Sequence, residues 1–321
     1  MNLVRWRTVA GATFFFSRPM CPGPSGRRRS LRESISNRHD VTSKRNRPAA
    51  AETMSHPSRD RVKRHVGGRL AWYARAATEA FWEDYWRLTV TPRAFEEAPA
   101  RIESMRTGRA LLRHLSQTGM HLEAGCGPGF WVHALRSRGF RVCGLDFSVT
   151  PLLAATAVQP GLPLAAADVL CSPFGDEVFD SYLSFGVIEH REAGPEPFLR
   201  EAYRVLKSGG VLVVSVPSFG PIRRCKAALG AYRGGPPAGL SFYQYGFTRT
   251  GLEQILRQAG FDPIEAFYES PHRLLQEELP GYAEQARRRG GRHLKRLAET
   301  VLGRLDGHML VIVAKKVLFE R

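Results

Sequence analysis

The 321-residue sequence predicts an α/β fold built on a doubly wound parallel sheet. A glycine-rich turn, residues 125–129, links an apolar segment to the start of a helix. Short apolar segments that end in an acidic residue then alternate with helical stretches, as in folds made of βαβ units. Residues 211–217 are a continuous apolar run, which is typical of a strand buried on both faces of a parallel sheet.

The first strand, the glycine turn and the first helix of the sheet domain are predicted within residues 119–130. Three glycines at alternate positions let the backbone approach a ligand closely, because no Cβ intervenes and a positive φ carries no steric penalty. The spacing G-x-G-x-G differs from the dinucleotide pattern G-x-G-x-x-G, and Phe130 stands where that pattern has glycine or alanine. Glu123 comes just before the loop, where its charge would oppose a phosphate and suit a ligand amine.

Two further strands are predicted to end in acids. Residues 141–146 end in Asp146, about 20 residues beyond the glycine loop, an offset at which a carboxylate binds ribose hydroxyls in nucleotide-type folds. The alternative is that Asp146 only caps the helix that starts near Ser148. Residues 163–169 predict a third strand with an acid, Asp168, at its end. For Asp168, a simple loop-capping role is the stronger alternative.

The remaining elements follow in order. Residues 173–190 predict a turn, a fourth strand and a short loop that ends at His190. Helical spacing over 196–206 ends at Lys207-Ser208-Gly209-Gly210, a common helix stop. A helix with Thr248 as its N-cap precedes strands at 261–268 and 308–316. Residues 218–246 and 271–306 are then insertions that can overhang the carboxyl ends of the strands.

Taken in order over residues 119–217, these segments resemble the motifs of class I S-adenosylmethionine-dependent methyltransferases of the small-molecule type. Residues 201–210 are close to the third motif of that family, with Ser208 where proline is usual. The resemblance implies a Rossmann-like doubly wound seven-stranded sheet, mostly parallel with an antiparallel last strand, together with N-terminal helices. The lid-like insertions at 218–246 and 271–306 are departures of this chain from that fold. It implies S-adenosyl-L-methionine as the cofactor and a small organic molecule as the methyl acceptor. The residues placed at the cofactor are Glu123, Gly125, Gly127, Gly129, Asp146, Phe147, Asp168, Val169 and Phe185.

The implied chemistry asks little of the protein beyond placement. A sulfonium methyl is already activated, so the site must align the acceptor with it and exclude water. A general base helps where the acceptor is a hydroxyl, and His190 is the candidate catalytic residue. The alternative is that His190 only orders its loop or contacts the cofactor. No feature of the sequence distinguishes oxygen, nitrogen, carbon or sulfur acceptors.

Three alternative functions stay open at this point. One is methylation of a lipid or quinone at a membrane surface, which the basic residues of 287–305 and the aromatic residues of the insertion 218–246 favour. Another is a nicotinamide-dependent dehydrogenase, which the glycine spacing, Glu123 and the third motif oppose. The last is a cofactor-binding protein without turnover.

The chain divides into a basic, disordered extension (1–60), an N-terminal helical cap (61–118) and the sheet domain (119–321). The net charge is +17, but residues 1–50 hold eleven Lys/Arg and only two acids. The extension could be a transit peptide, a secretory signal or a segment upstream of an initiator at Met54, which is the favoured reading. In the cap, an aromatic helical stripe covers 69–90 and a second helix covers 101–117.

Partners and compartment are predicted from charge and cysteine usage. Residues 287–305 predict a basic amphipathic helix. A face exposed to solvent is the commonest explanation of such a pattern, and contact with a membrane surface is the more specific hypothesis. No nucleic-acid partner and no metal site are predicted. Five cysteines without C-x-x-C spacing suggest reduced thiols and a cytoplasmic location. No apolar run approaches the ~18 residues of a membrane span.

Overall fold

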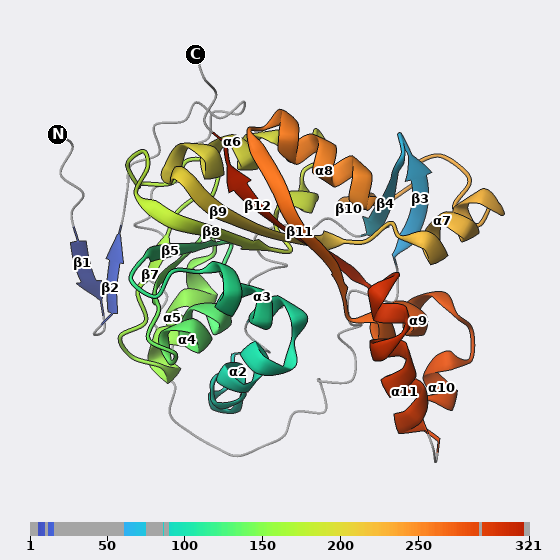
Figure 1. Cartoon of the computed structure of the whole chain (residues 1–321), viewed down its shortest axis with the longest axis horizontal. Helices are drawn as coiled ribbons and strands as arrows, with labels where there is room; N and C mark the ends of the chain where they lie inside the picture. Colours follow the sequence, from blue (N-terminus) through green and yellow to red (C-terminus); the bar gives the residue numbers. More distant parts are fainter. Residues whose placement is uncertain are drawn as a thin grey trace.

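The computed structural model describes residues 6–9, 12–15, 61–74, 86, 90–288 and 291–317. Its centre is a 7-stranded sheet in the order β11-β12-β9-β8-β5-β6-β7 (Figure 1). The strands are β5 (Met120–Ala124), β6 (Arg141–Asp146), β7 (Leu164–Ala166), β8 (Phe179–Phe185), β9 (Leu206–Pro217), β11 (Phe261–Glu269) and β12 (Met309–Lys316). β12 pairs antiparallel with both of its neighbours, whereas the other pairs are parallel. The predicted sheet, including its antiparallel last strand, is confirmed.

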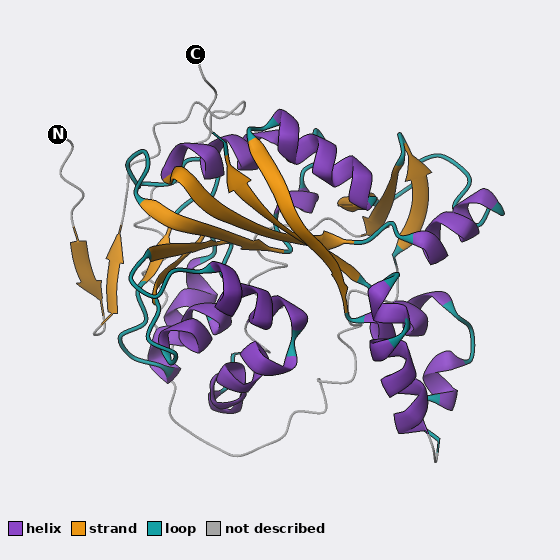
Figure 2. Cartoon of the chain, viewed as in Figure 1, coloured by secondary structure: helices purple, strands orange, loops and turns teal. Residues whose placement is uncertain are grey.

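Helices cover both faces of this sheet (Figure 2). The helices on one face are α2 (Pro92–Ser104), α3 (Arg106–His114), α4 (Phe130–Arg136) and α5 (Val149–Val158), and those on the other are α6 (Glu196–Val205) and α8 (Arg249–Gln258). β9 contributes Val213 to the first core and Val214 to the second. This two-sided burial explains the continuous apolar run in its sequence.

The helix ends show where local signals were sufficient. Thr248 is the N-cap of α8, and its Oγ1 accepts a hydrogen bond from the Gly251 amide at 3.0 Å, as predicted. The helix predicted over 196–206 is confirmed as α6, which ends at Val205. β9 begins directly at Leu206, so residues 207–210 belong to the strand and do not form the predicted glycine cap. Pairing with β8 shifts from Leu206 to Val211, so the glycines at 209 and 210 lie in an irregular stretch of the strand.

The prediction of a helical cap over 61–118 is wrong for its first part. Residues 62–66 and 69–74 form the hairpin β3 (Val62–Val66) and β4 (Arg69–Ala74). β4 also pairs with β10 (Ser241–Gly246) from the first insertion, giving a 3-stranded lid sheet in the order β10-β4-β3. The aromatic residues of β4 fit a strand as well as a helix, and pairing with a distant segment decides between them. Of residues 75–90, all but Trp86 and Val90 lie outside the described part of the chain.

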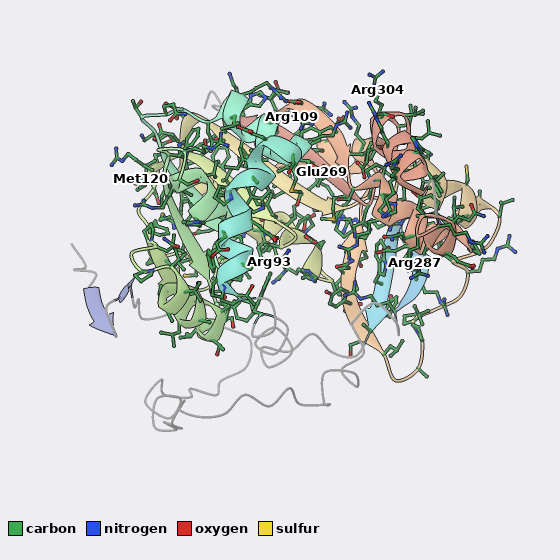
Figure 3. The ribbon with its side chains drawn as sticks, turned by 90° about the horizontal axis from the view of Figure 1, so that it is seen from below. Arg93, Arg109, Met120, Glu269, Arg287 and Arg304 are labelled. Carbon is green, nitrogen blue, oxygen red and sulfur yellow. The ribbon has the colours of Figure 1, made fainter. Side chains whose placement is uncertain are left out.

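The second half of the cap is helical but is divided differently from the prediction. The single helix expected over 101–117 is two helices, α2 and α3, separated at Met105, whose backbone is extended. A Cβ at Gly108 would lie 2.1 Å from the Ile102 carbonyl oxygen, so the tight turn between the helices requires glycine there. Glu269 of β11 completes the first turn of α3 by accepting hydrogen bonds from the amide and hydroxyl of Thr107. Figure 3 shows Glu269 beside α3, which carries the labelled Arg109.

The extension at the N-terminus is not disordered throughout, which corrects the prediction. Residues 6–9 and 12–15 form β1 (Trp6–Val9) and β2 (Ala12–Phe15), an antiparallel pair that lies near β7 (Figure 1). Their β-branched and aromatic residues are typical of strands. The rest of residues 1–60, including Met54, lies outside the described residues.

The two insertions hold most of the remaining secondary structure. The first contains α7 (Pro221–Ala228) and β10, and the second contains α9 (Pro271–Glu278), α10 (Tyr282–Gln285), α11 (Gly291–Thr300) and the 3₁₀ turn η3 (Leu302–Arg304). The single basic helix predicted over 287–305 is wrong in extent, because α11 begins only at Gly291 and η3 follows it. Asp306 joins the insertions by accepting a hydrogen bond from the Ile222 amide at the start of α7.

A buried ionic network fastens the second insertion to the lid sheet and to α7. Arg223 of α7 is fully buried and donates from Nε to Glu278 Oε1 at 2.9 Å and from Nη2 to Glu277 Oε2 at 2.9 Å. Glu278 also contacts Lys63 of β3 and Lys226 of α7. These cations hold the pKa of Glu278 at about 2 against the opposing effect of burial. Because removal of one partner would leave a buried charge, this network fixes the two insertions relative to each other.

Cysteine state and membrane character complete the description. Cys126, Cys143 and Cys225 are free thiols, whereas Cys171 is in a disulfide, so the prediction of reduced thiols is wrong for Cys171. Among the described residues, no helix combines the length and apolar character needed to span a membrane.

Candidate functional site

The glycine loop folds back over the sheet at the carboxyl end of β5. The amides of Gly125 and Cys126 both donate to the Leu145 carbonyl, at 2.7 and 3.0 Å, which anchors the loop to β6. Gly125 and Gly127 have φ values of 77° and 51°. A Cβ at Gly125 would lie 2.3 Å from Val187, and one at Gly127 would lie 2.8 Å from the Trp86 ring. The loop therefore needs glycine for both its backbone angles and its close contacts.

A cavity of about 730 Å³ opens beside this loop. It lies where β5, β6 and β8 end, which is the point where the strand order reverses. Open α/β sheets bind their ligands at such a switch point. The lining residues are Trp86, Ala94, Glu123, Gly125, Cys126, Pro128, Phe130, Trp131, Asp146, Phe147, Asp168, Val169, Leu170, Phe185, Gly186, Val187, His190 and Phe198.

The cavity brings together most of the residues that the sequence pointed to. Those among its lining residues are Glu123, Gly125, Asp146, Phe147, Asp168, Val169, Phe185 and His190. Gly127 and Gly129 are not in the lining: the first packs under Trp86 and the second, with φ 77°, is the N-cap residue of α4. Trp131 and Phe198 were missed, although each lies on a predicted helix. Trp86 could not have been found, because its position over Gly127 is a tertiary contact.

Asp146 supports the start of a helix, as one of the two sequence interpretations predicts, and it also lines the cavity. Its Oδ1 accepts from the Ser148 amide at 2.9 Å, and its Oδ2 accepts from the Gly127 amide at 2.7 Å. The carboxylate therefore supports the start of α5 and the glycine loop together. It also lines the cavity, and each oxygen can accept a further hydrogen bond.

Glu123 lies deeper in the cavity wall and is almost fully buried. Its Oε2 accepts from the Val132 amide at 3.2 Å, at the first turn of α4. Burial raises the pKa of Glu123 well above its usual value, and the nearby Asp146 charge adds to that effect. Burial also raises the pKa of Asp146. Two desolvated carboxyl groups at one end of a cavity favour a ligand with positive charge.

Asp168 and its neighbours close another side of the cavity. Asp168 Oδ1 accepts from the Leu170 amide at 2.8 Å, the local turn expected of a loop-capping aspartate. Val169 is buried beside it, whereas Phe147 leaves 46% of its surface exposed. Among the described residues, neither Glu123, Asp146 nor Asp168 forms a salt bridge, which leaves their acceptors available to a cationic ligand.

His190 also lines the cavity, from the 3₁₀ turn η2 (Ile188–His190) after β8. Its Nδ1 is 2.8 Å from the Tyr243 carbonyl oxygen on the lid strand β10, so Nδ1 carries the hydrogen and donates it. Burial lowers the pKa of His190 to about 4, and the charge of Arg61 contributes in the same direction. The imidazole is therefore neutral at physiological pH.

Glu189 lies directly behind His190 and is buried. Its Oε1 is 3.9 Å from His190 Nε2, and its Oε2 has no hydrogen-bond partner among the described residues. Burial raises the pKa of Glu189 to about 8, so the side chain is mostly a neutral carboxylic acid near pH 7. This uncharged form explains why a carboxyl group can occupy the floor without a cationic partner.

The cysteine in the glycine loop is not arranged for reactivity. Burial raises the pKa of the Cys126 thiol well above its usual value, and the charges of Asp146 and Glu123 act in the same direction. A thiolate is therefore disfavoured, in line with a small residue chosen for loop geometry. No cluster of His, Cys, Asp or Glu suited to a metal ion occurs within the described ranges.

Comparison with known proteins points to one family. Residues 122–214 match the family model described as a methyltransferase domain. A probable S-adenosylmethionine-dependent methyltransferase of Mycolicibacterium smegmatis is 34% identical over 97 residues, 30% of this chain and 37% of that protein. A demethylmenaquinone methyltransferase of Renibacterium salmoninarum is 37% identical over 106 residues, 32% of this chain and 44% of that protein.

A third relative extends the match further along the chain. The ubiquinone biosynthesis O-methyltransferase of Ruegeria pomeroyi is 30% identical over 150 residues, 45% of this chain and 60% of that protein. The chain thus spans less than two thirds of the length of each of these relatives. The matched region contains the glycine loop, Asp146, Asp168 and His190, which are the residues that meet at the cavity.

The site fits S-adenosylmethionine on chemical grounds. This cofactor carries a sulfonium, an ammonium and a ribose diol, and the cavity offers buried carboxyl groups without cationic partners among the described residues. The cavity volume lies within the range of small-molecule sites. Residues 122–214 match a methyltransferase domain, and the motifs and the strand order of the sheet agree with the class I S-adenosylmethionine-dependent type.

Proposed function

We propose that the whole protein transfers a methyl group from S-adenosylmethionine to a small organic acceptor whose reacting part is an apolar ring. The observation that carries this proposal is the mixed lining of the cavity. It combines the carboxyl groups of Glu123, Asp146 and Asp168 with aromatic rings, among them Trp131, Phe185 and Phe198. An aromatic wall suits a flat, apolar acceptor.

A quinone-type ring is the acceptor class that we favour. Two of the relatives are named as methyltransferases of quinone biosynthesis, and this supports the proposal without fixing the ring or the acceptor atom. The lid strand β10 places Tyr243 against His190 of the cavity lining, with ring centroids 5.0 Å apart. A lipid acceptor is the second candidate, supported by the exposed apolar and basic surface of α11 described below.

In the proposed mechanism the chain binds the cofactor, orients the acceptor and excludes water from both. When bound, the cofactor supplies a methyl group on a positively charged sulfur. We assign cofactor binding to the glycine loop and to Glu123, Asp146 and Asp168 through their free acceptor positions. Glycine at 125 and 127 allows close backbone approach, and Trp86 covers the loop from the other side. Aromatic side chains keep water from the acceptor, so orientation and desolvation supply most of the catalysis.

For His190 we favour a positioning role over that of a general base. Its Nδ1–H already donates to the Tyr243 carbonyl, and a pKa near 4 makes it a weak base. The hydrogen bond joins the loop after β8 to the lid strand. His190 then holds the acceptor side of the cavity in shape and is neutral throughout the physiological range.

The test is methyl transfer by the full chain. The purified protein is incubated with methyl-labelled S-adenosylmethionine and, separately, with a short-chain demethylated naphthoquinol and a ring-hydroxylated benzoquinol. Mass spectrometry then identifies the methylated product. Labelled product with either ring supports the proposal. Binding of S-adenosylhomocysteine without product from any quinol, together with product from a polar amine acceptor, contradicts the proposed acceptor class. A cytoplasmic location is also our proposal, supported by the intracellular origin of the methyl donor.

A further inference from the structure

The second insertion exposes an apolar stripe on a strongly basic surface. Leu297 lies in the last turn of α11, Val301 directly follows that helix, and Leu305 follows η3. These side chains leave 58%, 55% and 65% of their surfaces exposed. The same helix packs against the fold through Gly291 and Ala298, which are buried. The stripe is therefore not part of the face that holds α11 to the protein.

Cations surround this stripe. The segment from 287 to 305 contains Arg287, Arg288, Arg289, Arg292, Lys295, Arg296 and Arg304 against a single acid, Glu299. Of those that the structure describes, only Arg288 forms a salt bridge, with Glu284. Figure 3 shows Arg287 and Arg304 on this insertion, well apart from each other. An exposed apolar strip with unneutralised cations is complementary to an anionic lipid surface, where apolar side chains insert and Lys/Arg meet headgroups.

The position of the insertion relates this surface to the cavity. β11 runs parallel to β9, because β12 is antiparallel to both. The insertion leaves the carboxyl end of β11, so it lies at the same edge of the sheet as the cavity. Arg223 and Glu278 fasten its first helix, α9, to α7, and Lys63 fastens it to β3 of the lid sheet. A membrane held against α11 would thus lie at the edge of the sheet that holds the cavity.

We propose that the surface formed by Leu297, Val301, Leu305 and the adjoining Arg296 and Arg304 docks the protein on an anionic lipid bilayer. This inference deepens the proposed function, because a quinone with an isoprenoid tail resides in such a bilayer. It does not depend on that function for its test, since lipid binding is measured without cofactor or acceptor.

The experiment is co-sedimentation of the full chain with vesicles. We expect binding to vesicles of phosphatidylcholine with about one quarter phosphatidylglycerol, weaker binding at high salt, and little binding to phosphatidylcholine alone. The triple variant Leu297→Ser/Val301→Ser/Leu305→Ser should weaken binding by ~10-fold or more. Arg296→Gln/Arg304→Gln should weaken it by roughly 30-fold. The matched controls Leu153→Ser on α5 and Arg200→Gln on α6 should leave it unchanged.

Several outcomes would overturn the proposal. One is absence of binding by the wild-type chain, and another is equal binding by the wild-type and triple variant, which would assign the affinity to the basic N-terminal residues. A third is a wild-type dimer, seen by light scattering, that the triple variant converts to monomer without any vesicle binding. Unchanged melting temperature and S-adenosylhomocysteine affinity in the variants show that a loss of lipid binding is not a loss of fold. Vesicle binding without quinol methylation would support this proposal and contradict only the proposed acceptor.

Discussion

His190 donates its Nδ1 hydrogen to the main-chain carbonyl of Tyr243, 2.8 Å away, although 53 positions separate the two residues in the sequence. This hydrogen bond joins the loop that follows β8 to the first insertion. The loop after β8 and the lid sheet are therefore held together, and a substitution in one should affect the stability of the other.

The positioning role of His190 gives the first prediction. His190→Ala should weaken binding of S-adenosylhomocysteine or destabilise the lid, whereas His190→Asn should restore much of the loss because its amide can still donate to Tyr243. Calorimetry and thermal unfolding measure both effects. If His190 were instead the general base, both variants would retain affinity and lose turnover by ~10²–10⁴-fold. With the pKa at about 4, the wild-type activity should not rise through the usual histidine range of about pH 6–7.

Glu189 gives a prediction about stability and pH. Its pKa is raised from 4.5 to about 8 in the folded protein, so the folded state holds a proton that the unfolded state releases above pH 4.5. The contribution to stability is complete below 4.5 and is lost as pH rises towards 8. Glu189→Gln, which cannot ionise, should match the wild type at low pH and exceed its unfolding free energy by a few kcal/mol at pH 8. Urea unfolding across this range measures the difference. The exposed control Glu192→Gln should show no such trend. A difference in unfolding free energy between Glu189→Gln and the wild type that does not vary with pH would exclude the mechanism.

A comparison of Gly127 with Gly139 separates the effect of backbone strain from that of a steric clash with Trp86. A Cβ at Gly127 would meet the Trp86 ring, whereas a Cβ at Gly139, which also has positive φ, would meet nothing within 4 Å. Gly139→Ala should cost about 1–2 kcal/mol of stability and leave cofactor affinity intact. Gly127→Ala should add a loss of affinity of ~10-fold or more, because Trp86 is displaced from the cavity wall, and Gly127→Val should abolish binding. Equal affinities for the two alanine variants would show that Trp86 does not shape the cofactor site.

Asp146 can be tested for ribose binding despite its structural hydrogen bonds. Asp146→Asn should weaken binding of S-adenosylhomocysteine by ~1.5–3 kcal/mol through loss of charge-assisted hydrogen bonds. The decisive comparison uses an analogue that lacks both ribose hydroxyls. If Asp146 binds the diol, the variant and the wild type should bind this analogue almost equally. An undiminished effect with the analogue would limit Asp146 to support of Gly127 and Ser148.

The buried network around Glu278 should dominate the stability of the insertions. Glu278→Gln leaves Arg223 buried with one partner fewer, and breaking a buried pair costs about 3–5 kcal/mol. The matched control is Glu284→Gln, which breaks the exposed pair with Arg288 and should cost at most about 1 kcal/mol. Denaturant unfolding compares the two. Similar small losses would mean that the insertions do not depend on the network.

The sequence by itself determined the sheet, its strand order along the chain and the chemistry at its edge. Apolar runs, a glycine-rich turn and acids at strand ends are local signals, because burial and turn geometry act on neighbouring residues. Glu123, Asp146, Asp168 and His190 could be placed at one cavity since the carboxyl ends of parallel strands share an edge.

Only the tertiary structure decided what covers that edge. Residues 69–74 are a strand because β10, far along the chain, supplies a pairing partner, and an aromatic pattern alone fits either structure. Trp86 over Gly127, Glu269 at the start of α3 and Tyr243 on His190 are contacts between segments that no local spacing brings together. The neutral state of Glu189 likewise depends on burial, which comes from packing around the residue and not from its identity.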